Sequence, residues 1–310
     1  MPCRPPRHHT IPGAALDRWY QWGREQGQRH GVPQGELDWL MEAIADVDRL
    51  ALRLGTLGDR PQIQSQFDLD TLTQCWEQRC RDRTPVQYLA GHTPWRNLTL
   101  RVSPAVLIPR PETELLVDLI CQKLQEASPL DPPHVPLTIA DLGTGSGAIA
   151  LGLATLLPPT AQIYGVDCSA DAIAIARHNA QHCLPPSRAI HLLEGSWFEP
   201  LGDLQGQITV MVANPPYIPS ATVPTLAPEV THHEPHLALD GGQDGLDDIR
   251  HLITQGAAYL SPQGLWAVEH MAGQGETIAQ LLTQSGQYSR IEIHKDLADR
   301  DRFVTAFRRP

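Results

Sequence analysis

The feature that most constrains this chain is the alternation of apolar runs and helix-like segments that begins at residue 137. Such alternation requires crossover connections, which place successive strands parallel in one sheet. The last two apolar runs, Tyr288–His294 and Phe303–Phe307, have no helix between them and should pair antiparallel. The pattern predicts an α/β fold with a mostly parallel sheet and an antiparallel last strand. The other predicted strands are Leu137–Leu142, Ile163–Val166, Ile190–Leu193, Ile208–Ala213 and Gly264–Glu269, and the predicted helices are Ile149–Leu157, Ala170–His182 and Glu276–Thr283.

The first part of the chain has helical periodicity instead. Apolar residues recur three and four positions apart, as at Leu37, Leu40, Met41 and Ile44. Clusters of glycine and proline divide this part into short segments. The pattern therefore predicts a small N-terminal helical bundle.

Residues between these two patterns read as a β-hairpin. Apolar residues alternate over Leu98–Val102, and Val106–Ile108 is a second apolar run. A helix is predicted to follow over Glu112–Glu126. The expected domains are a helical domain over residues 1–88, a hairpin linker over 89–110 and an α/β domain over 111–310.

The charge of the chain is distributed unevenly. The net charge is −11, but residues 1–100 carry 12 basic and 12 acidic residues, so the imbalance lies in residues 101–310. An acidic body repels phosphate backbones. DNA or RNA is therefore disfavoured as a direct partner.

The cysteines and the N-terminus give no sign of export or of a metal site. The 6 cysteines are dispersed in a chain long enough to form a full core, and none has partners at zinc-ligand spacing. The stretch Met1–His9 lacks the apolar region of a secretory signal, and no apolar run approaches the ~18 residues of a membrane span. We expect a soluble cytoplasmic protein without a bound metal ion and without membrane contact.

A glycine-rich stretch follows the first strand of the α/β part. Asp141–Gly147 has the sequence Asp-Leu-Gly-Thr-Gly-Ser-Gly, and Asp167 ends the next strand 26 residues after Asp141. Glycines allow close approach of the backbone to a ligand, and an acidic residue at the second strand can accept both hydrogen bonds of a ribose diol. The glycine spacing departs from the dinucleotide pattern and favours S-adenosylmethionine. The candidate cofactor-binding residues are Asp141, Gly143, Thr144, Gly145, Ser146, Gly147 and Asp167.

A second constellation, Asn214-Pro215-Pro216-Tyr217, directly follows another predicted strand. Two successive prolines fix φ twice and remove two N–H donors, which leaves a rigid turn rich in acceptors. The Asn214 side-chain oxygen and the Pro215 carbonyl can both accept from one planar NH2 group, and Tyr217 supplies an aromatic face. We therefore predict that Asn214, Pro215, Pro216 and Tyr217 form the catalytic and substrate-binding turn.

These motifs together resemble those of class I S-adenosylmethionine-dependent methyltransferases that act on planar amino or amide nitrogen. A more specific resemblance lies upstream, where Thr84–Gly91 and Val106–Glu114 are similar to the release factor glutamine methyltransferases, the HemK family. The resemblance covers roughly residues 76–310. It continues through Glu234-Pro235, Ala238-Leu239, Gly245-Leu246, Asp296 and Arg302-Phe303-Val304.

The resemblance implies a Rossmann-like catalytic domain that carries out a methyl transfer. A methyl group would pass from S-adenosylmethionine to the side-chain nitrogen of the glutamine in the GGQ motif of peptide chain release factors. It implies that Trp197 and Asn214 also line the cofactor site and that Arg110 and Glu112 contact the substrate. The helical domain would recognise the release factor. We also expect the protein to be a monomer.

Two positions depart from the family pattern. An acidic residue often reaches the adenine after the third strand, but the aligned position here is Ser196, with Glu194 close by. Glu269-His270-Met271 also replaces the family's usual Glu-Ile-Gly.

Three other functions remain open at this point. Ribosomal-protein glutamine methyltransferases share the motifs but carry serine where this chain has Pro111. Adenine-N6 DNA methyltransferases share the Asn-Pro-Pro-Tyr turn but would need a basic target-recognition region and a base-flipping pocket. A non-catalytic cofactor-binding scaffold would not need that turn at all.

Overall fold

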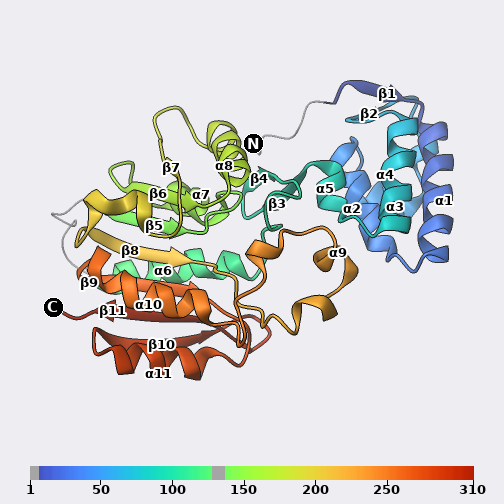
Figure 1. The fold of residues 1–310 in the computed structure, drawn as a ribbon. Coiled ribbons are helices and arrows are strands. Elements are labelled where there is room, and N and C mark those ends of the chain that lie inside the picture. The colour runs from blue at the N-terminus through green and yellow to red at the C-terminus, as the bar shows by residue number, and fades with distance from the viewer. Residues whose placement is uncertain (1–6, 128–136) are drawn as a thin grey trace. The chain divides into compact units, whose positions relative to one another are not determined.

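The computed structural model describes residues 7–127 and 137–310, which form two compact units (Figure 1). One unit contains the described residues before Pro94 together with Ala227–His233. The other contains Pro94–Leu226 and Glu234–Pro310. Residues 1–6, which hold most of the stretch used to argue against a secretory signal, lie outside the described residues. None of the described helices is long and apolar enough to cross a membrane.

The first unit is a helical bundle, as predicted. Asp48 and Asp68 cap two of its helices by accepting hydrogen bonds from the backbone N–H groups of Ala51 and Thr71. A short two-stranded sheet that the sequence did not indicate also belongs to it. The elements are β1 (His9–Ile11), α1 (Gly13–Arg29), α2 (Gln34–Ile44), α3 (Arg49–Leu54), the 3₁₀ turn Leu57–Asp59, β2 (Ile63–Ser65), α4 (Leu69–Asp82), α5 (Val86–Ala90) and α9 (Pro228–Thr231).

A buried arginine joins α9 to the helices of this unit. The Arg79 side chain is 1% exposed, and its guanidinium donates to Glu36 of α2 at 2.5 and 2.8 Å and to Glu229 of α9 at 2.7 Å. Arg83 pairs with the same Glu229 carboxylate. The segment Ala227–His233 therefore folds with the helical bundle, although the residues before and after it belong to the other unit.

The second unit is built on a seven-stranded sheet of order β10-β11-β9-β8-β5-β6-β7 (Figure 1). Five neighbouring strands are parallel, and β11 is antiparallel to both of its neighbours. The predicted mostly parallel sheet with an antiparallel last strand is confirmed. The strands are β5 (Thr138–Leu142), β6 (Gln162–Asp167), β7 (His191–Glu194), β8 (Ile208–Ala213), β9 (Leu260–Glu269), β10 (Tyr288–Lys295) and β11 (Asp301–Arg308).

The linking hairpin is present, but one of its predicted strands is wrong. The hairpin consists of β3 (His92–Trp95) and β4 (Leu98–Arg101). Val106–Ile108 is not a strand. Pro104 and Pro109 flank this run and lack N–H donors for a ladder. Its apolar side chains are buried instead, with Val106 2% and Ile108 5% exposed, and this explains the apolar pattern.

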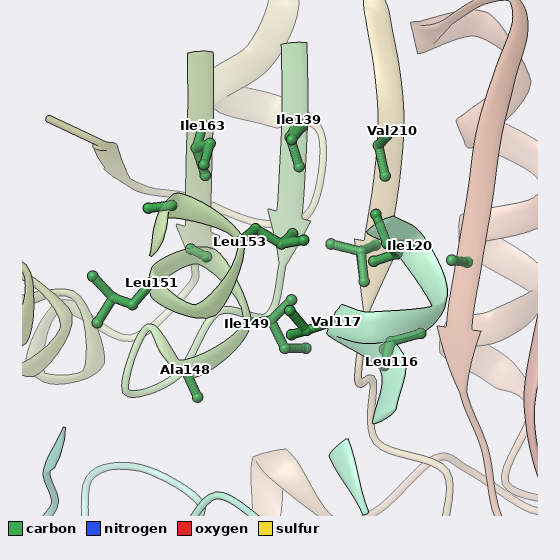
Figure 2. Packing of buried hydrophobic residues seen from close by; sticks show 14 of the residues in the cluster. Leu116, Val117, Ile120, Ile139, Ala148, Ile149, Leu151, Leu153, Ile163 and Val210 are labelled. Carbon is green, nitrogen blue, oxygen red and sulfur yellow. The ribbon is translucent and has the colours of Figure 1, made fainter. Parts of the chain in front are cut away.

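Helices cover both faces of the large sheet. Successive residues of β5 and β8 point to opposite faces, so Ile139 and Val210 pack with α6 and α7 (Figure 2), while Met211 packs with α10 and α11 on the other face. Both faces are therefore buried, which explains why these strands are apolar along most of their length. The helices are α6 (Thr113–Ala127), α7 (Ala148–Leu156), α8 (Ala170–Cys183), α10 (Asp247–Tyr259) and α11 (Gly275–Ser285).

The strand order reverses between two neighbouring strands, β5 and β8. From β5 the chain adds β6 and β7 on one side, and it returns to place β8 and then β9 on the other. In open α/β sheets the crevice at such a reversal, at the carboxyl ends of the strands, is where ligands bind. The glycine loop (residues 141–147) ends β5 and the Asn-Pro-Pro-Tyr turn (residues 214–217) ends β8, so the fold brings the two sequence motifs to this crevice.

Candidate active site

The glycine loop turns sharply after β5 and leads into α7. Gly143, Gly145 and Gly147 have φ values of 75°, 55° and 83°, in the left-handed region that favours glycine. The backbone N–H groups of Gly143 and Thr144 both donate to the Val166 carbonyl at 2.9 Å, which holds the loop against β6. The loop conformation therefore depends on its glycines.

Asp141 braces this loop from behind. Its side chain is fully buried, and Oδ2 accepts from the Thr144 hydroxyl at 2.6 Å and from the Ala150 backbone N–H at 3.0 Å. Burial raises the pKa of this carboxyl to about 7, although both hydrogen bonds lower it. Gly165 on the paired strand makes room, because a Cβ there would lie 3.0 Å from Thr144 Oγ1.

Asp167 faces the other side of the loop. Its two oxygens accept one backbone N–H each, from Gly145 and from Ser169 just before α8, both at 2.9 Å. A carboxylate has about four lone-pair sites, so each oxygen retains a free direction. The two hydrogen bonds therefore fix the orientation of the Asp167 carboxylate, which can still accept the hydrogen bonds of a ribose diol.

The Asn-Pro-Pro-Tyr turn is held by two side chains that are distant in the sequence. Asn214 Nδ2 donates to the hydroxyl of Thr113 at 3.3 Å. The Tyr217 hydroxyl donates to Glu269 at 3.2 Å, and burial raises the pKa of that hydroxyl. With Nδ2 held by Thr113, the amide oxygen is the polar atom of Asn214 that stays available as an acceptor.

A cavity of about 310 Å³ brings the two motifs together. That volume lies at the small end of the range for ligand pockets. Four predicted site residues do not line it, namely Asp141, Gly147, Pro215 and Tyr217. The predicted site residues that line it are Gly143, Thr144, Gly145, Ser146, Asp167, Trp197, Asn214 and Pro216.

One wall of the cavity lies after β7. Gly195, Ser196 and Trp197 line it, whereas Glu194 does not, so Ser196 occupies the position where an acidic residue was expected. Trp197 has a φ of 48°, a rare value for a bulky residue. Asp248 lies near this side chain, and burial raises the pKa of its carboxyl. Asp248 also lines the cavity and was not identified from the sequence.

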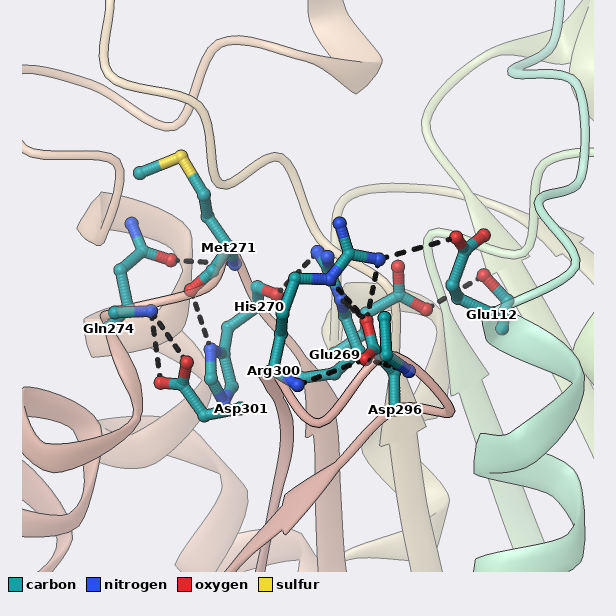
Figure 3. Close-up of polar contacts among 12 residues, drawn as sticks. Glu112, Glu269, His270, Met271, Gln274, Asp296, Arg300 and Asp301 are labelled. Atoms are coloured by element: carbon teal, nitrogen blue, oxygen red, sulfur yellow. Dashed lines mark hydrogen bonds and ion pairs between the residues drawn. The ribbon is translucent and has the colours of Figure 1, made fainter.

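Arg110 and Glu112 make ion pairs instead of lining the cavity. Arg110 donates to both carboxylate oxygens of Glu234, at 2.6 and 2.8 Å, and Glu234 is only 4% exposed. Glu112 lies 3.7 Å from the guanidinium of Arg300, which also binds Asp296 (Figure 3). The structure shows both residues as parts of salt-linked connections near the start of α6.

The helical unit has a cavity of its own, of about 530 Å³, lined by residues such as Gly23, Gly27 and Trp76. It contains none of the predicted motif residues. We therefore place the candidate active site in the cavity of the α/β unit. No group of three metal-ligating side chains occurs in residues 7–127 and 137–310.

Known proteins resemble this chain along nearly its whole length. A sequence model described as a methyltransferase domain matches residues 134–217. The release factor glutamine methyltransferase of Synechocystis sp. is 47% identical over 96% of this chain and 97% of its own length. The chain belongs to the release factor glutamine methyltransferase family. A second member, from Thermosynechococcus vestitus, is 42% identical over 96% of this chain and 99% of its own. A methyltransferase structure from Pyrococcus furiosus shares 15% identity and a TM-score of 0.47, covering 68% of this chain and 89% of that chain.

Membership in the release factor glutamine methyltransferase family makes this chain an S-adenosylmethionine-dependent enzyme with a class I methyltransferase fold. The cavity has features that fit that cofactor: the positive-φ glycines of the loop, the oriented Asp167 carboxylate and the flat Trp197 side chain. Thr113 and Glu269 support the Asn-Pro-Pro-Tyr turn. Both lie in stretches compared with the family, but the sequence assigned neither of them a role.

Proposed function

We propose that this enzyme methylates the side-chain amide nitrogen of the glutamine in the GGQ motif of peptide chain release factors. The observation that carries the proposal is the cavity in which the glycine loop and the Asn-Pro-Pro-Tyr turn face one ligand space. The near full-length identity to enzymes named for this reaction supports it.

The chemistry requires placement more than a strong base. An amide nitrogen is a poor nucleophile because its lone pair is delocalised into the carbonyl. S-adenosylmethionine, when bound, supplies an electrophilic methyl group on a positively charged sulfur. The chain's part is to hold the amide nitrogen in line and to accept the positive charge that develops on it.

Asn214 and Pro215 are suited to that part. The Asn214 oxygen and the Pro215 carbonyl would accept the two hydrogens of the substrate NH2 group. These bonds strengthen as nitrogen becomes positive, so they stabilise the transition state more than the ground state. Pro216 keeps the turn rigid, and Tyr217, tied to Glu269, fixes its far end. The proton can leave to water, because an N-alkylated protonated amide is strongly acidic.

The glycine loop and its neighbours would hold the cofactor. Asp167 would accept from the ribose hydroxyls, the backbone from Gly143 to Gly147 would follow the ligand, and Trp197 would pack on the adenine. Asp141 would act indirectly, since its bonds to Thr144 and Ala150 fix the loop.

The helical domain, with Arg110 and Glu112 on the other unit, is proposed to recognise the release factor. The Arg79–Glu229 ion pair supports this role, because it ties the segment that follows the Asn-Pro-Pro-Tyr turn in the chain to the bundle. We propose that a monomer acts on the protein substrate in the cytoplasm without direct contact with nucleic acid. The acidic charge of residues 101–310 is consistent with that.

The test of the reaction is to supply methyl-labelled cofactor with one of three acceptors. These are a release factor, a ribosomal protein and duplex DNA, and the label is located by mass spectrometry. Label on the GGQ glutamine is expected, and a release factor with alanine in place of that glutamine is the matched control. Label on the ribosomal protein or on adenine, with an unmodified release factor, would contradict the proposal.

The recognition role of the helical domain has its own test. A shortened chain that begins at Pro94 should bind cofactor normally, because every cofactor residue lies after residue 140. It should methylate a short GGQ peptide far better, relative to the full chain, than it methylates a whole release factor. Full-length rates on the whole release factor, with cofactor binding intact, would remove the recognition role.

A further inference from the structure

Two buried residues near Asn214 contribute no atom to the proposed clamp, although one of them, Thr113, also lines the cavity. Thr113 begins α6 and is 4% exposed, and Glu269 ends β9 and is 1% exposed. They are 156 residues apart in the chain, and the Thr113 hydroxyl donates to Glu269 Oε2 at 2.7 Å. Figure 3 shows Glu269 in the polar cluster that also contains Glu112 and Arg300.

The direction of this hydrogen bond decides what Thr113 can offer Asn214. An ionised carboxylate only accepts, so it uses the single hydroxyl hydrogen of Thr113. The Thr113 oxygen can then only accept, and its partner at 3.3 Å must be the NH2 group of Asn214. The two ends of an asparagine amide have nearly the same shape, so packing alone distinguishes them poorly.

We propose that Glu269 and Thr113 are positioning residues for methyl transfer: ionised Glu269 makes Thr113 an acceptor, and Thr113 holds Asn214 with its oxygen toward the substrate amide. The proposal rests on the proposed function of Asn214 as the substrate clamp. With the amide reversed, Asn214 would present NH2 to the substrate NH2, and the clamp would lose one of its two acceptors.

The same carboxylate also holds the other end of the turn. Glu269 Oε1 accepts from the Tyr217 hydroxyl at 3.2 Å. One side chain therefore sets the rotamer of Asn214 through Thr113 and anchors Tyr217 directly. This arrangement explains why a carboxylate is kept in a buried position where it is costly.

Protonation of Glu269 would remove the constraint on the orientation of the Asn214 amide. Burial raises the pKa of Glu269 to about 7; the bonds from Thr113 and Tyr217 and the charge of Arg302 lower it, and Glu112 raises it. A protonated Glu269 can donate to the Thr113 oxygen, which frees the hydroxyl hydrogen to bond the Asn214 oxygen. The orientation of the Asn214 amide is thus expected to change with pH near neutrality.

Selective ¹⁵N labelling of asparagine reads this orientation without any substrate. The chain has three asparagines, Asn97, Asn179 and Asn214, and loss of one signal in Asn214→Ala assigns the relevant NH2 group. Its resonance should titrate with a midpoint of about 7 in the wild type and not in Glu269→Gln. Asn179 is the internal control, since its amide bonds only backbone groups of Arg101 and Ser146. An Asn214 signal that ignores pH, or that titrates equally in Glu269→Gln, would overturn the proposal.

Two variants at position 113 separate the effect of the hydroxyl from the effect of side-chain packing. Thr113→Val keeps the shape and removes the hydroxyl, and we expect kcat to fall about 10-fold or more while cofactor affinity by calorimetry stays within about threefold. Thr113→Ser keeps the hydroxyl and should restore most of kcat. Equal loss in both variants, or full kcat in Thr113→Val, contradicts the positioning role.

The two proposals fail in different ways. If the wild-type enzyme does not methylate release factor, the proposed function fails. The asparagine titration still decides whether Glu269 and Thr113 set the orientation of the Asn214 amide. If the wild type methylates release factor and Thr113→Val does so equally fast, only the positioning role fails.

Discussion

Each end of the cavity is supported by a buried carboxylate that accepts a hydrogen bond from a threonine hydroxyl. Asp141 accepts from Thr144 at 2.6 Å behind the glycine loop, and Glu269 accepts from Thr113 at 2.7 Å behind the Asn-Pro-Pro-Tyr turn. Burial raises the pKa of both carboxyls to about 7. Both lie at the carboxyl ends of strands, β5 and β9.

The two supports differ in their distance along the chain. The partners of Asp141 are three and nine residues away, whereas those of Glu269 are 52 and 156 residues away. The glycine loop is thus stabilised by its own motif. The orientation of the Asn-Pro-Pro-Tyr turn depends on the complete tertiary fold. We expect the first end to set cofactor affinity and the second to set the rate of transfer.

The largest effect is expected at the transfer end. Asn214→Ala removes one of two acceptors at the reacting nitrogen, so kcat should fall by about 10²–10³-fold while most cofactor affinity remains. Asn214→Asp keeps an acceptor and should retain partial activity. Steady-state kinetics with a release factor measure both. A kcat above about a tenth of wild type in Asn214→Ala would refute the two-acceptor clamp.

At the cofactor end, Asp141→Ala should cost stability. It leaves the Thr144 hydroxyl and the Ala150 N–H without their buried partner, and the loss should total about 3 kcal/mol of unfolding free energy. Urea denaturation measures it, and cofactor affinity should fall with it. Glu269→Gln keeps the size of its side chain and should instead lower kcat with cofactor affinity intact. Loss of affinity in both variants would erase the difference between the two ends.

The same contrast explains what could be predicted from the sequence. Asp141, Asp167 and Asn214 each end a strand with a clear apolar pattern, so the motifs and the parallel sheet were recognisable. Thr113 and Glu269 are 156 residues apart, and only the packing of α6 against β9 in the folded protein brings them together. Val106–Ile108 looked like a strand because burial against the cavity and burial in a sheet leave the same apolar pattern.

Loss of the ribose-binding carboxylate should weaken the cofactor without disturbing the fold. Asp167→Ala removes a charge-assisted acceptor of about 1.5–3 kcal/mol, or roughly 10- to 100-fold in affinity. Asp171→Ala, in the first turn of α8 at an exposed position away from the cavity, is the matched control. Unchanged affinity by calorimetry in Asp167→Ala would remove this residue from the cofactor site.

The smallest effect is a pH dependence of stability. Both carboxyls have folded-state pKa values raised above their unfolded values, to about 7. The folded state therefore binds more protons between about pH 4 and 7, and the contribution of each group falls as pH rises through that window. Asp141→Asn and Glu269→Gln should each flatten the decline seen in urea denaturation between about pH 4 and 7. A decline as steep as that of the wild type would mean that these groups ionise normally.

A double-mutant cycle tests the division of labour most directly. Cofactor affinity and the single-turnover rate of transfer at saturating cofactor are measured in the wild type, Asp167→Ala, Asn214→Ala and the double variant. Asp167→Ala should change mainly the affinity and Asn214→Ala mainly the rate, and the double variant should show the sum of the two within about 0.5 kcal/mol. If Asn214→Ala weakened cofactor affinity as much as Asp167→Ala and left the rate at saturation unchanged, the account of binding at one end and transfer at the other would be wrong.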